Sequence, residues 1–170
     1  TEKVKLAYRS LFSIFDKVSF FLNNYYSLSI DPSSSKLTEQ VMNKLPKIYD
    51  CDKNHPLSGI SWLLKDVYEE SYKKYLDNDT KLIREIRNQI EHKYLKVTDY
   101  NITTGKLSKP DSLLADGMAY YVSRSEFNDK ALKLLKLSRS LLIYLLLAIK
   151  KDQDIKNLKI IYHLVKEKGY

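Results

Sequence analysis

The 170-residue sequence contains few of the residue types that build disulfides, metal centres or phosphate-binding loops. Its one cysteine, Cys51, excludes an intramolecular disulfide, and the flanking Asp50 and Asp52 disfavour the thiolate that a catalytic nucleophile needs. Its three histidines are not clustered, so we expect neither a metal site nor a cofactor. Its four glycines are scattered singly, which excludes a P-loop and a dinucleotide-binding fingerprint.

The sequence also lacks a long hydrophobic run. The longest, residues 141–149, is too short to span a bilayer and is bounded by Arg139 and Lys150, so we expect a buried helix and no membrane segment. No secretory leader is visible at Thr1 and no intramolecular disulfide can form, so we expect a cytoplasmic protein. The missing initiator methionine suggests that one helical domain, residues 1–170, was excised from a longer chain with a sensing or scaffold region upstream.

Apolar residues recur at helical intervals along most of the chain. The pattern predicts helices over 4–27, 38–45, 57–76 and 80–97, a last long helix that begins at 123 or 125 and runs to 151, and a further amphipathic helix over 155–168. Pro46 is expected to halt the second helix, and residues 123–126 form a capping-box pattern before the last long one. Between residues 98 and 124 the helical period is lost, and a turn at 103–106 would join strands 97–102 and 119–122. The predicted fold class is all-α: an up-and-down helical bundle of four to five main helices, with a small irregular or β-hairpin excursion before the last long helix.

The predicted helix over 80–97 separates apolar from polar residues around its axis, at about 100° of rotation per residue. The apolar stripe that we expect to face the core consists of Ile83, Ile86, Ile90, Tyr94 and Val97. The polar residues that project away from this stripe are Arg87, Asn88, Glu91 and His92. A solvated helix face with an Arg87–Glu91 ion pair, four residues apart, would explain these charges without any further function.

Arg87, Asn88 and His92 resemble the R-x4-6-H signature of the HEPN superfamily, in a form similar to the RNxxEHxY pattern of a bacterial subgroup. The resemblance extends over most of the chain, through residues 7–18, 54–57, the helix with Trp62, and 120–124. It implies an α-helical fold and metal-independent cleavage of RNA, in a toxin or defence context. It also implies a homodimer, because the two subunits would bring their motif helices together at a composite site. A HEPN-type dimerisation module, or one that binds nucleotide or RNA without turnover, is the alternative.

The resemblance also implies a role for each motif residue. Arg87 would hold the scissile phosphate, His92 would transfer a proton to or from the reacting oxygens, and Asn88 would orient them. The products would carry 2′,3′-cyclic phosphate and 5′-hydroxyl ends, because the attacking oxygen belongs to the RNA. Residues that could support the site, or equally serve as capping and surface residues, are Arg84, Glu91, Asp66 and Asn54.

Tyr94 has two interpretations. A tyrosine at helical spacing is most often packed in a core, as the apolar stripe predicts. The other interpretation comes from toxins similar to this chain whose motif reads R-x4-H-x-Y, as Arg87, His92 and Tyr94 do here. The partner of such a toxin is a nucleotidyltransferase antitoxin that adenylylates the tyrosine, so Tyr94 is a possible modification site.

The net charge of +8 is concentrated in the last quarter of the chain. Residues 130–170 contain ten cations and three acids, which leaves +7 there and only +1 in the rest. A basic stretch of this kind would attract RNA through its phosphates. A lysine-rich solubilising surface is the competing interpretation.

Overall fold

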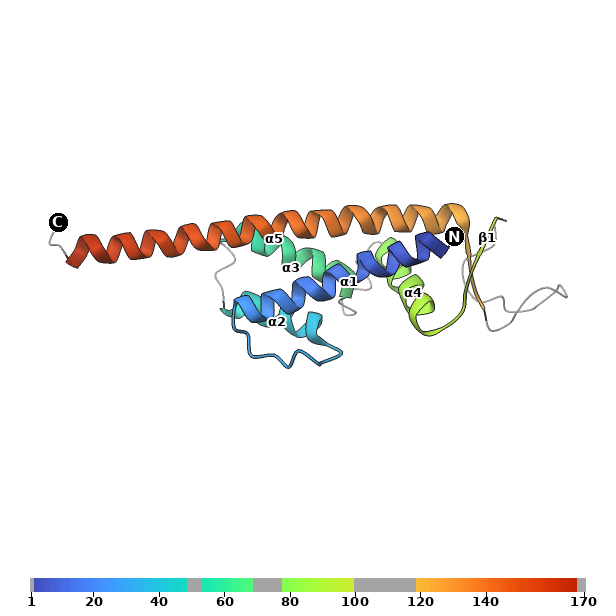
Figure 1. Ribbon diagram of the computed structural model, residues 1–170, viewed down its shortest axis with the longest axis horizontal. Helices are drawn as coiled ribbons and strands as arrows, with labels where there is room; N and C mark the ends of the chain where they lie inside the picture. The colour runs from blue at the N-terminus through green and yellow to red at the C-terminus, as the bar shows by residue number, and fades with distance from the viewer. Residues whose placement is uncertain (1, 49–52, 69–77, 100–118, 168–170) are drawn as a thin grey trace.

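The computed structural model describes residues 2–48, 53–68, 78–99 and 119–167. In chain order they form α1 (Glu2–Tyr25), α2 (Leu37–Ile48), α3 (His55–Tyr68), α4 (Asn78–His92), β1 (Leu95–Thr98), β2 (Tyr120–Ser123) and α5 (Arg124–Glu167). Figure 1 shows α5 along one side of the molecule with α1 and α3 against it, α2 on the far side, and α4 and the strands near the N-terminus. The predicted all-α bundle with a small excursion before the last helix is confirmed.

One cluster of buried apolar side chains joins all five helices. Each helix contributes residues three or four positions apart, such as Tyr8, Phe12 and Phe15 of α1 or Ile83, Ile86 and Ile90 of α4, because this spacing keeps them on one face. Within the described residues, no helix combines the length and the apolar content that crossing a bilayer requires.

The end of α1 fixes the loop that follows it. Ser27 adopts a left-handed φ of 49°, and the amides of Ser27 and Leu28 donate to the carbonyls of Asn24 and Asn23, at 3.2 and 3.0 Å. This is the Schellman arrangement that closes many helices. The side chain of Asn23 also bonds both backbone groups of Ile30, at 2.9 and 3.2 Å. The chain is therefore turned back toward α1 before α2 begins.

Helices α2 and α5 both continue past their predicted ends. Pro46 does not halt α2, which continues two residues farther to Ile48; the φ of a proline is compatible with a helix, although a proline has no amide to donate to the carbonyl four residues earlier. The predicted break between residues 151 and 155 is also wrong, and α5 is one helix of 44 residues. No proline or glycine interrupts it, and buried Asp152 accepts a hydrogen bond from Tyr25 at 3.0 Å and pairs with Lys156 at 2.7 Å.

The two strands pair in parallel, so the predicted β-hairpin is wrong. Leu95 pairs with Tyr120 and Thr98 with Ser123, whereas a hairpin turn at 103–106 would give antiparallel strands. Parallel pairing needs a connection of about a dozen residues or more, and the chain between the strands is long enough. The turn itself lies outside the described residues. Ser123 then accepts a bond from the amide of Glu126 at 3.2 Å, which confirms the predicted N-cap of α5.

Candidate functional site

Helix α4 carries the motif residues, and its position is fixed by α1. Its buried face consists of Ile83, Ile86 and Ile90, as the sequence predicted. The hydroxyl of buried Tyr8 donates to the carbonyl of Ile83 at 2.8 Å. These contacts fix the rotation of α4 about its own axis relative to α1, and with it the direction in which the polar side of α4 faces.

The C-terminus of α4 is capped by a cation from α1. The guanidinium of Arg9 donates to the carbonyl of Ile90, which has no partner within its own helix, and a cation at this end also suits the helix dipole. The helix ends at His92, not at residue 97 as predicted. The carbonyl of Tyr94 instead accepts from the amide of Tyr120 at 2.9 Å, where the strand pairing begins.

This early helix end changes the position of Tyr94. The tyrosine lies beyond α4 and is 55% exposed, so its predicted packing in the core is wrong. The ammonium of Lys96 lies 5.5 Å from the centre of its ring. Tyr94 also borders a groove of about 470 Å³ together with Lys3, Lys93 and Arg9. Tyr94 therefore lies on an exposed groove that is lined by several cations and by Glu2, and this groove is not the one that the motif residues line.

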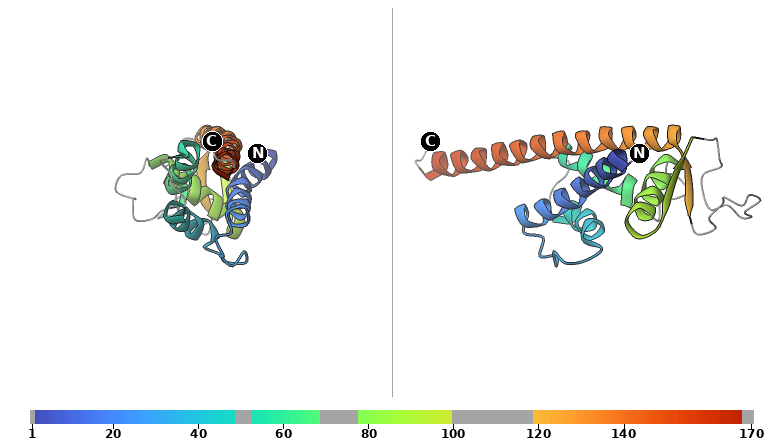
Figure 2. Two further views of the ribbon diagram at one scale, coloured as in Figure 1. Left: turned by 90° about the vertical axis from the view of Figure 1, so that its left-hand side faces the viewer. Right: turned by 45° about the vertical axis from the view of Figure 1, so that its right-hand side comes forward.

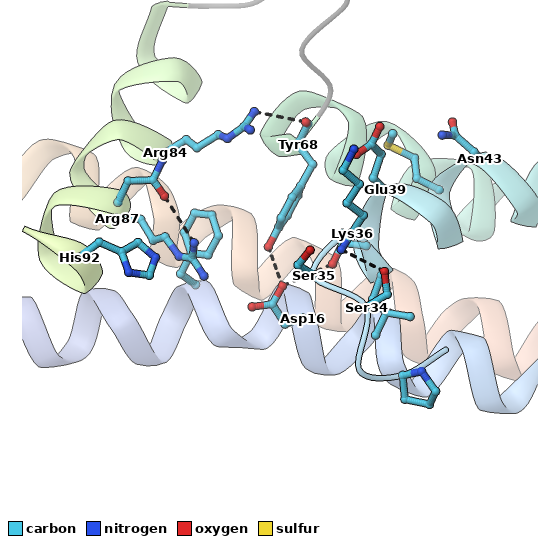
Figure 3. A pocket seen from close by; sticks show the side chains of 16 residues that line it. Asp16, Ser34, Ser35, Lys36, Glu39, Asn43, Tyr68, Arg84, Arg87 and His92 are labelled. Atoms are coloured by element: carbon cyan, nitrogen blue, oxygen red, sulfur yellow. Dashed lines mark hydrogen bonds between the residues drawn. The ribbon is translucent and has the colours of Figure 1, made fainter. Parts of the chain in front are cut away.

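The motif residues line an open pocket with a volume of about 1120 Å³, which we call the motif pocket. From α4 it receives Arg84, Arg87, Asn88 and His92. Figure 3 shows Arg87 and His92 extending from α4 on the same side. Two cationic guanidinium groups and an imidazole therefore border one solvent-accessible space, an arrangement suited to binding an anion such as phosphate.

Arg87 is held in a defined orientation at the pocket wall. Its guanidinium lies over the ring of buried Phe12 of α1, 5.2 Å from the ring centre, and donates to the amide oxygen of Asn88 at 3.4 Å. Arg84 donates to the carbonyl of Tyr68 at 3.3 Å. His92 is exposed, at the last position of α4. Arg87 lines the motif pocket while it makes this contact with the Phe12 ring.

A carboxylate, Asp16 of α1, lies farther along the pocket, one helical turn after the Phe12 ring that Arg87 contacts (Figure 3). Its Oδ1 accepts hydrogen bonds from the hydroxyl of Tyr68 at 2.9 Å and from that of Thr38 at 3.3 Å. Burial, and next the charge of Asp16, raise the pKa of Tyr68 above its ordinary value of 10.0, so this hydroxyl keeps its proton and remains a donor. The loop before α2 completes this wall with Ser34, Ser35 and Lys36.

The remaining candidate residues occupy other positions. Glu91 forms an ion pair with Arg9, at 3.6 Å, and not with Arg87. Asn54 is buried and caps α3, since its Oδ1 accepts from the amide of Leu57 at 3.2 Å and its Nδ2 donates to the carbonyl of Ala148 at 2.9 Å. Neither Asn54 nor Asp66 lines the motif pocket. In the described part of the chain no three His, Cys, Asp or Glu side chains gather as potential metal ligands.

A helical bundle with this arginine, asparagine and histidine on one helix has the arrangement expected of a HEPN domain. A family model described as LA2681-like HEPN matches residues 1–152, and the chain belongs to this family. No curated protein and no solved structure matches the chain. HEPN domains are often ribonucleases or nucleotide-binding modules, and they commonly dimerise and bind RNA. The matched region ends at residue 152, so the last part of α5 extends beyond it.

Proposed function

We propose that this HEPN domain is a metal-independent endoribonuclease whose active site is the motif pocket. The observation that supports this function most strongly is that Arg87 and His92, the two motif residues that carry its chemistry, border the same open pocket. The net charge of +8 also favours an RNA substrate, because a polyanion is attracted to such a protein. Exposed cations that contribute to this attraction along α5 include Lys136, Lys150 and Lys151.

In the proposed reaction, the planar guanidinium of Arg87 binds the scissile phosphate and stabilises the negative charge that grows in the transition state. The ribose 2′-oxygen attacks phosphorus while the imidazole of His92 takes its proton. The bond from phosphorus to the 5′-oxygen breaks, and an imidazolium protonates that oxygen. The products are a 2′,3′-cyclic phosphate and a 5′-hydroxyl. Asn88 contributes by holding Arg87 through its amide oxygen.

The composite site is part of this proposal, because one imidazole cannot be both base and acid in the same step. The second copy would supply its His92 across the open side of the motif pocket. The exposed leucines of α5, which include Leu132, Leu135, Leu142 and Leu146, offer an apolar surface for self-association. However, α5 lies on the opposite side of the bundle from α2 and its preceding loop (Figures 1 and 2). Contact through α5 would therefore leave both pockets open, and a shared site requires contact near α4.

The test is cleavage of RNA in EDTA by the native chain and by the Arg87→Ala and His92→Ala variants. Arg139→Ala and His55→Ala are matched controls, because both residues are exposed and lie outside the motif pocket. We expect the native chain and the controls to cut and the two motif variants to be inactive while keeping native helicity. Equal cleavage by all five proteins contradicts the proposal. RNA binding without cleavage by the native chain indicates the non-catalytic HEPN module instead.

Tyr94 is proposed as an adenylylation site, in a toxin and antitoxin pair. Its 55% exposure makes the hydroxyl accessible, and the cations of its groove, Lys3, Lys93 and Arg9, suit the phosphates of ATP and of the attached nucleotide. The test is intact mass after incubation with ATP and a nucleotidyltransferase encoded beside this chain. The expected result is added AMP on the native chain and none on Tyr94→Phe, and an unmodified native chain contradicts it.

A further inference from the structure

The motif pocket extends well beyond the residues that the cleavage reaction uses. We propose that its second wall, centred on Asp16, is a binding subsite for a guanine base of the RNA next to the scissile phosphate. This inference rests on the proposed function for its substrate class. It assigns a specificity-determining role to Asp16, Tyr68 and Thr38, which lie on three separate parts of the chain.

The hydrogen bonds of Asp16 are distributed unequally between its two oxygens. Oδ1 accepts from both Tyr68 and Thr38, which fills the two lone-pair positions of that oxygen. Oδ2 accepts no hydrogen bond from any described residue, although it borders an open pocket. The two hydroxyl donors thus fix the plane of the carboxylate and leave one oxygen available to a ligand.

The ligand at Oδ2 must be a hydrogen-bond donor. A carboxylate repels phosphate, so Asp16 does not extend the anion site that Arg84, Arg87 and His92 form in the same pocket. In RNA, the groups that donate from a position beside a phosphate are the N–H groups of the bases and the ribose hydroxyls. The pocket therefore provides one wall for phosphate and another for a base.

Guanine matches this acceptor better than the other bases. Its Watson–Crick edge presents two adjacent donors, the ring N1–H and the exocyclic amine, so that whichever of them donates to Oδ2, the group beside it is a further donor and not an acceptor. Adenine and cytosine place an unprotonated ring nitrogen beside their amine, and uracil places a carbonyl on each side of its N–H. In each of these three bases an acceptor would face the negative carboxylate.

The pocket has room for both groups. Its volume of about 1120 Å³ exceeds the roughly 300–1,000 Å³ of typical small-ligand sites, so a phosphate at Arg87 and a base at Asp16 fit together. Ser34, Ser35 and Lys36 lie beyond Asp16 in Figure 3 and provide polar contacts for the sugar. The Schellman turn at Ser27 and the side chain of Asn23 hold this loop near α1.

The test measures the affinity of the full chain for the 3′-monophosphates of guanosine, adenosine, cytidine and uridine, by calorimetry. The variants are Asp16→Asn, which keeps the shape but removes the negative acceptor, and Tyr68→Phe, which removes one donor to Oδ1. Asp129→Asn, an exposed aspartate on α5, is the matched control. We expect the native chain and the control to prefer the guanosine nucleotide at least tenfold, and Asp16→Asn to lose this preference while still binding all four. Tyr68→Phe should reduce the preference less, because Oδ2 remains.

The possible outcomes distinguish a failure of the guanine subsite from a failure of the proposed RNA cleavage. No affinity for any of the four nucleotides, no base preference, or a preference that Asp16→Asn retains, overturns the guanine subsite. If the chain cleaves RNA but without a preference for guanosine, the subsite fails and the proposed function stands. If the chain prefers the guanosine nucleotide but cuts no RNA, the proposed function fails and the subsite stands. A circular-dichroism spectrum of each variant shows whether its helices are intact.

Discussion

Asn54 was a candidate site residue in the sequence, and its contacts indicate that it stabilises the fold instead. Its substitution tests this structural role directly. The side chain is only 5% exposed, caps α3 through its Oδ1 and joins α3 to α5 through its Nδ2. Loss of an N-cap costs about 0.5–2 kcal/mol, and loss of the Nδ2 bond to Ala148, whose carbonyl also has its helical partner within α5, costs about 0.5–1.5 kcal/mol. We therefore expect Asn54→Ala to lower the free energy of unfolding by about 1–3 kcal/mol.

The assay is urea unfolding followed by circular dichroism, with the midpoint compared at an unchanged m value. Asn128→Ala is the matched control, since Asn128 is exposed on α5 and should change stability by less than about 0.5 kcal/mol. Asn54→Asp keeps the cap acceptor but not the donor, so it should also be destabilised. RNA cleavage per folded molecule should stay at the native level, because Asn54 lies outside the motif pocket. A loss for Asn54→Ala no larger than that of the control would refute the reasoning.

Three further predictions concern the motif helix, the tyrosines and the dimer. Arg9→Ala removes a charged, half-exposed cap from the carbonyl of Ile90 and should cost about 1–2 kcal/mol in urea unfolding; a shift below about 0.3 kcal/mol would exclude the capping role. Burial raises the pKa of Tyr68 and Tyr120 above the ordinary 10.0, so the stability they contribute is complete below pH 10 and falls as pH rises above it. Unfolding midpoints measured from pH 8 to about 11 should therefore decrease less in the Tyr120→Phe variant, and an equal decrease contradicts this assignment. An excess of His92→Ala mixed with the native chain should suppress native cleavage, because each mixed dimer would hold only one of the two His92 imidazoles that a composite site needs, whereas unchanged cleavage places the site within one chain.

The helices could be predicted from the sequence because a helix that buries one face has apolar residues three or four positions apart. Ile83, Ile86 and Ile90 follow this spacing, and all three are buried. Prediction failed where long-range pairing decides the structure. The strand at Leu95 pairs with one far along the chain, and this pairing, together with the cap from Arg9, ends α4 before residue 97 and exposes Tyr94. The residues near Leu95 in the sequence do not indicate whether its strand pairs in parallel or antiparallel, or with which partner strand.

The candidate site was predictable on one side only. Arg87, Asn88 and His92 share one helix, so their spacing was enough to place them together. The rest of the pocket wall comes from α1, α3 and the start of α2 with its preceding loop, and sequence reasoning missed Asp16, Tyr68 and Thr38 for that reason. One signal was present: Asp16 follows Phe12 by four residues, so the ring beneath Arg87 and this carboxylate lie on the same face of α1.

The most direct test of the central claim is a double-substitution cycle on the rate of RNA cleavage, with the native chain, Arg87→Ala, His92→Ala and the double variant. If the guanidinium and the imidazole act in one transition state, each single substitution slows cleavage by about 10²–10⁴-fold, and the double variant is little slower than the slower single one. Single variants that cut RNA at the native rate, or effects of the two substitutions that simply multiply in the double variant, would contradict it.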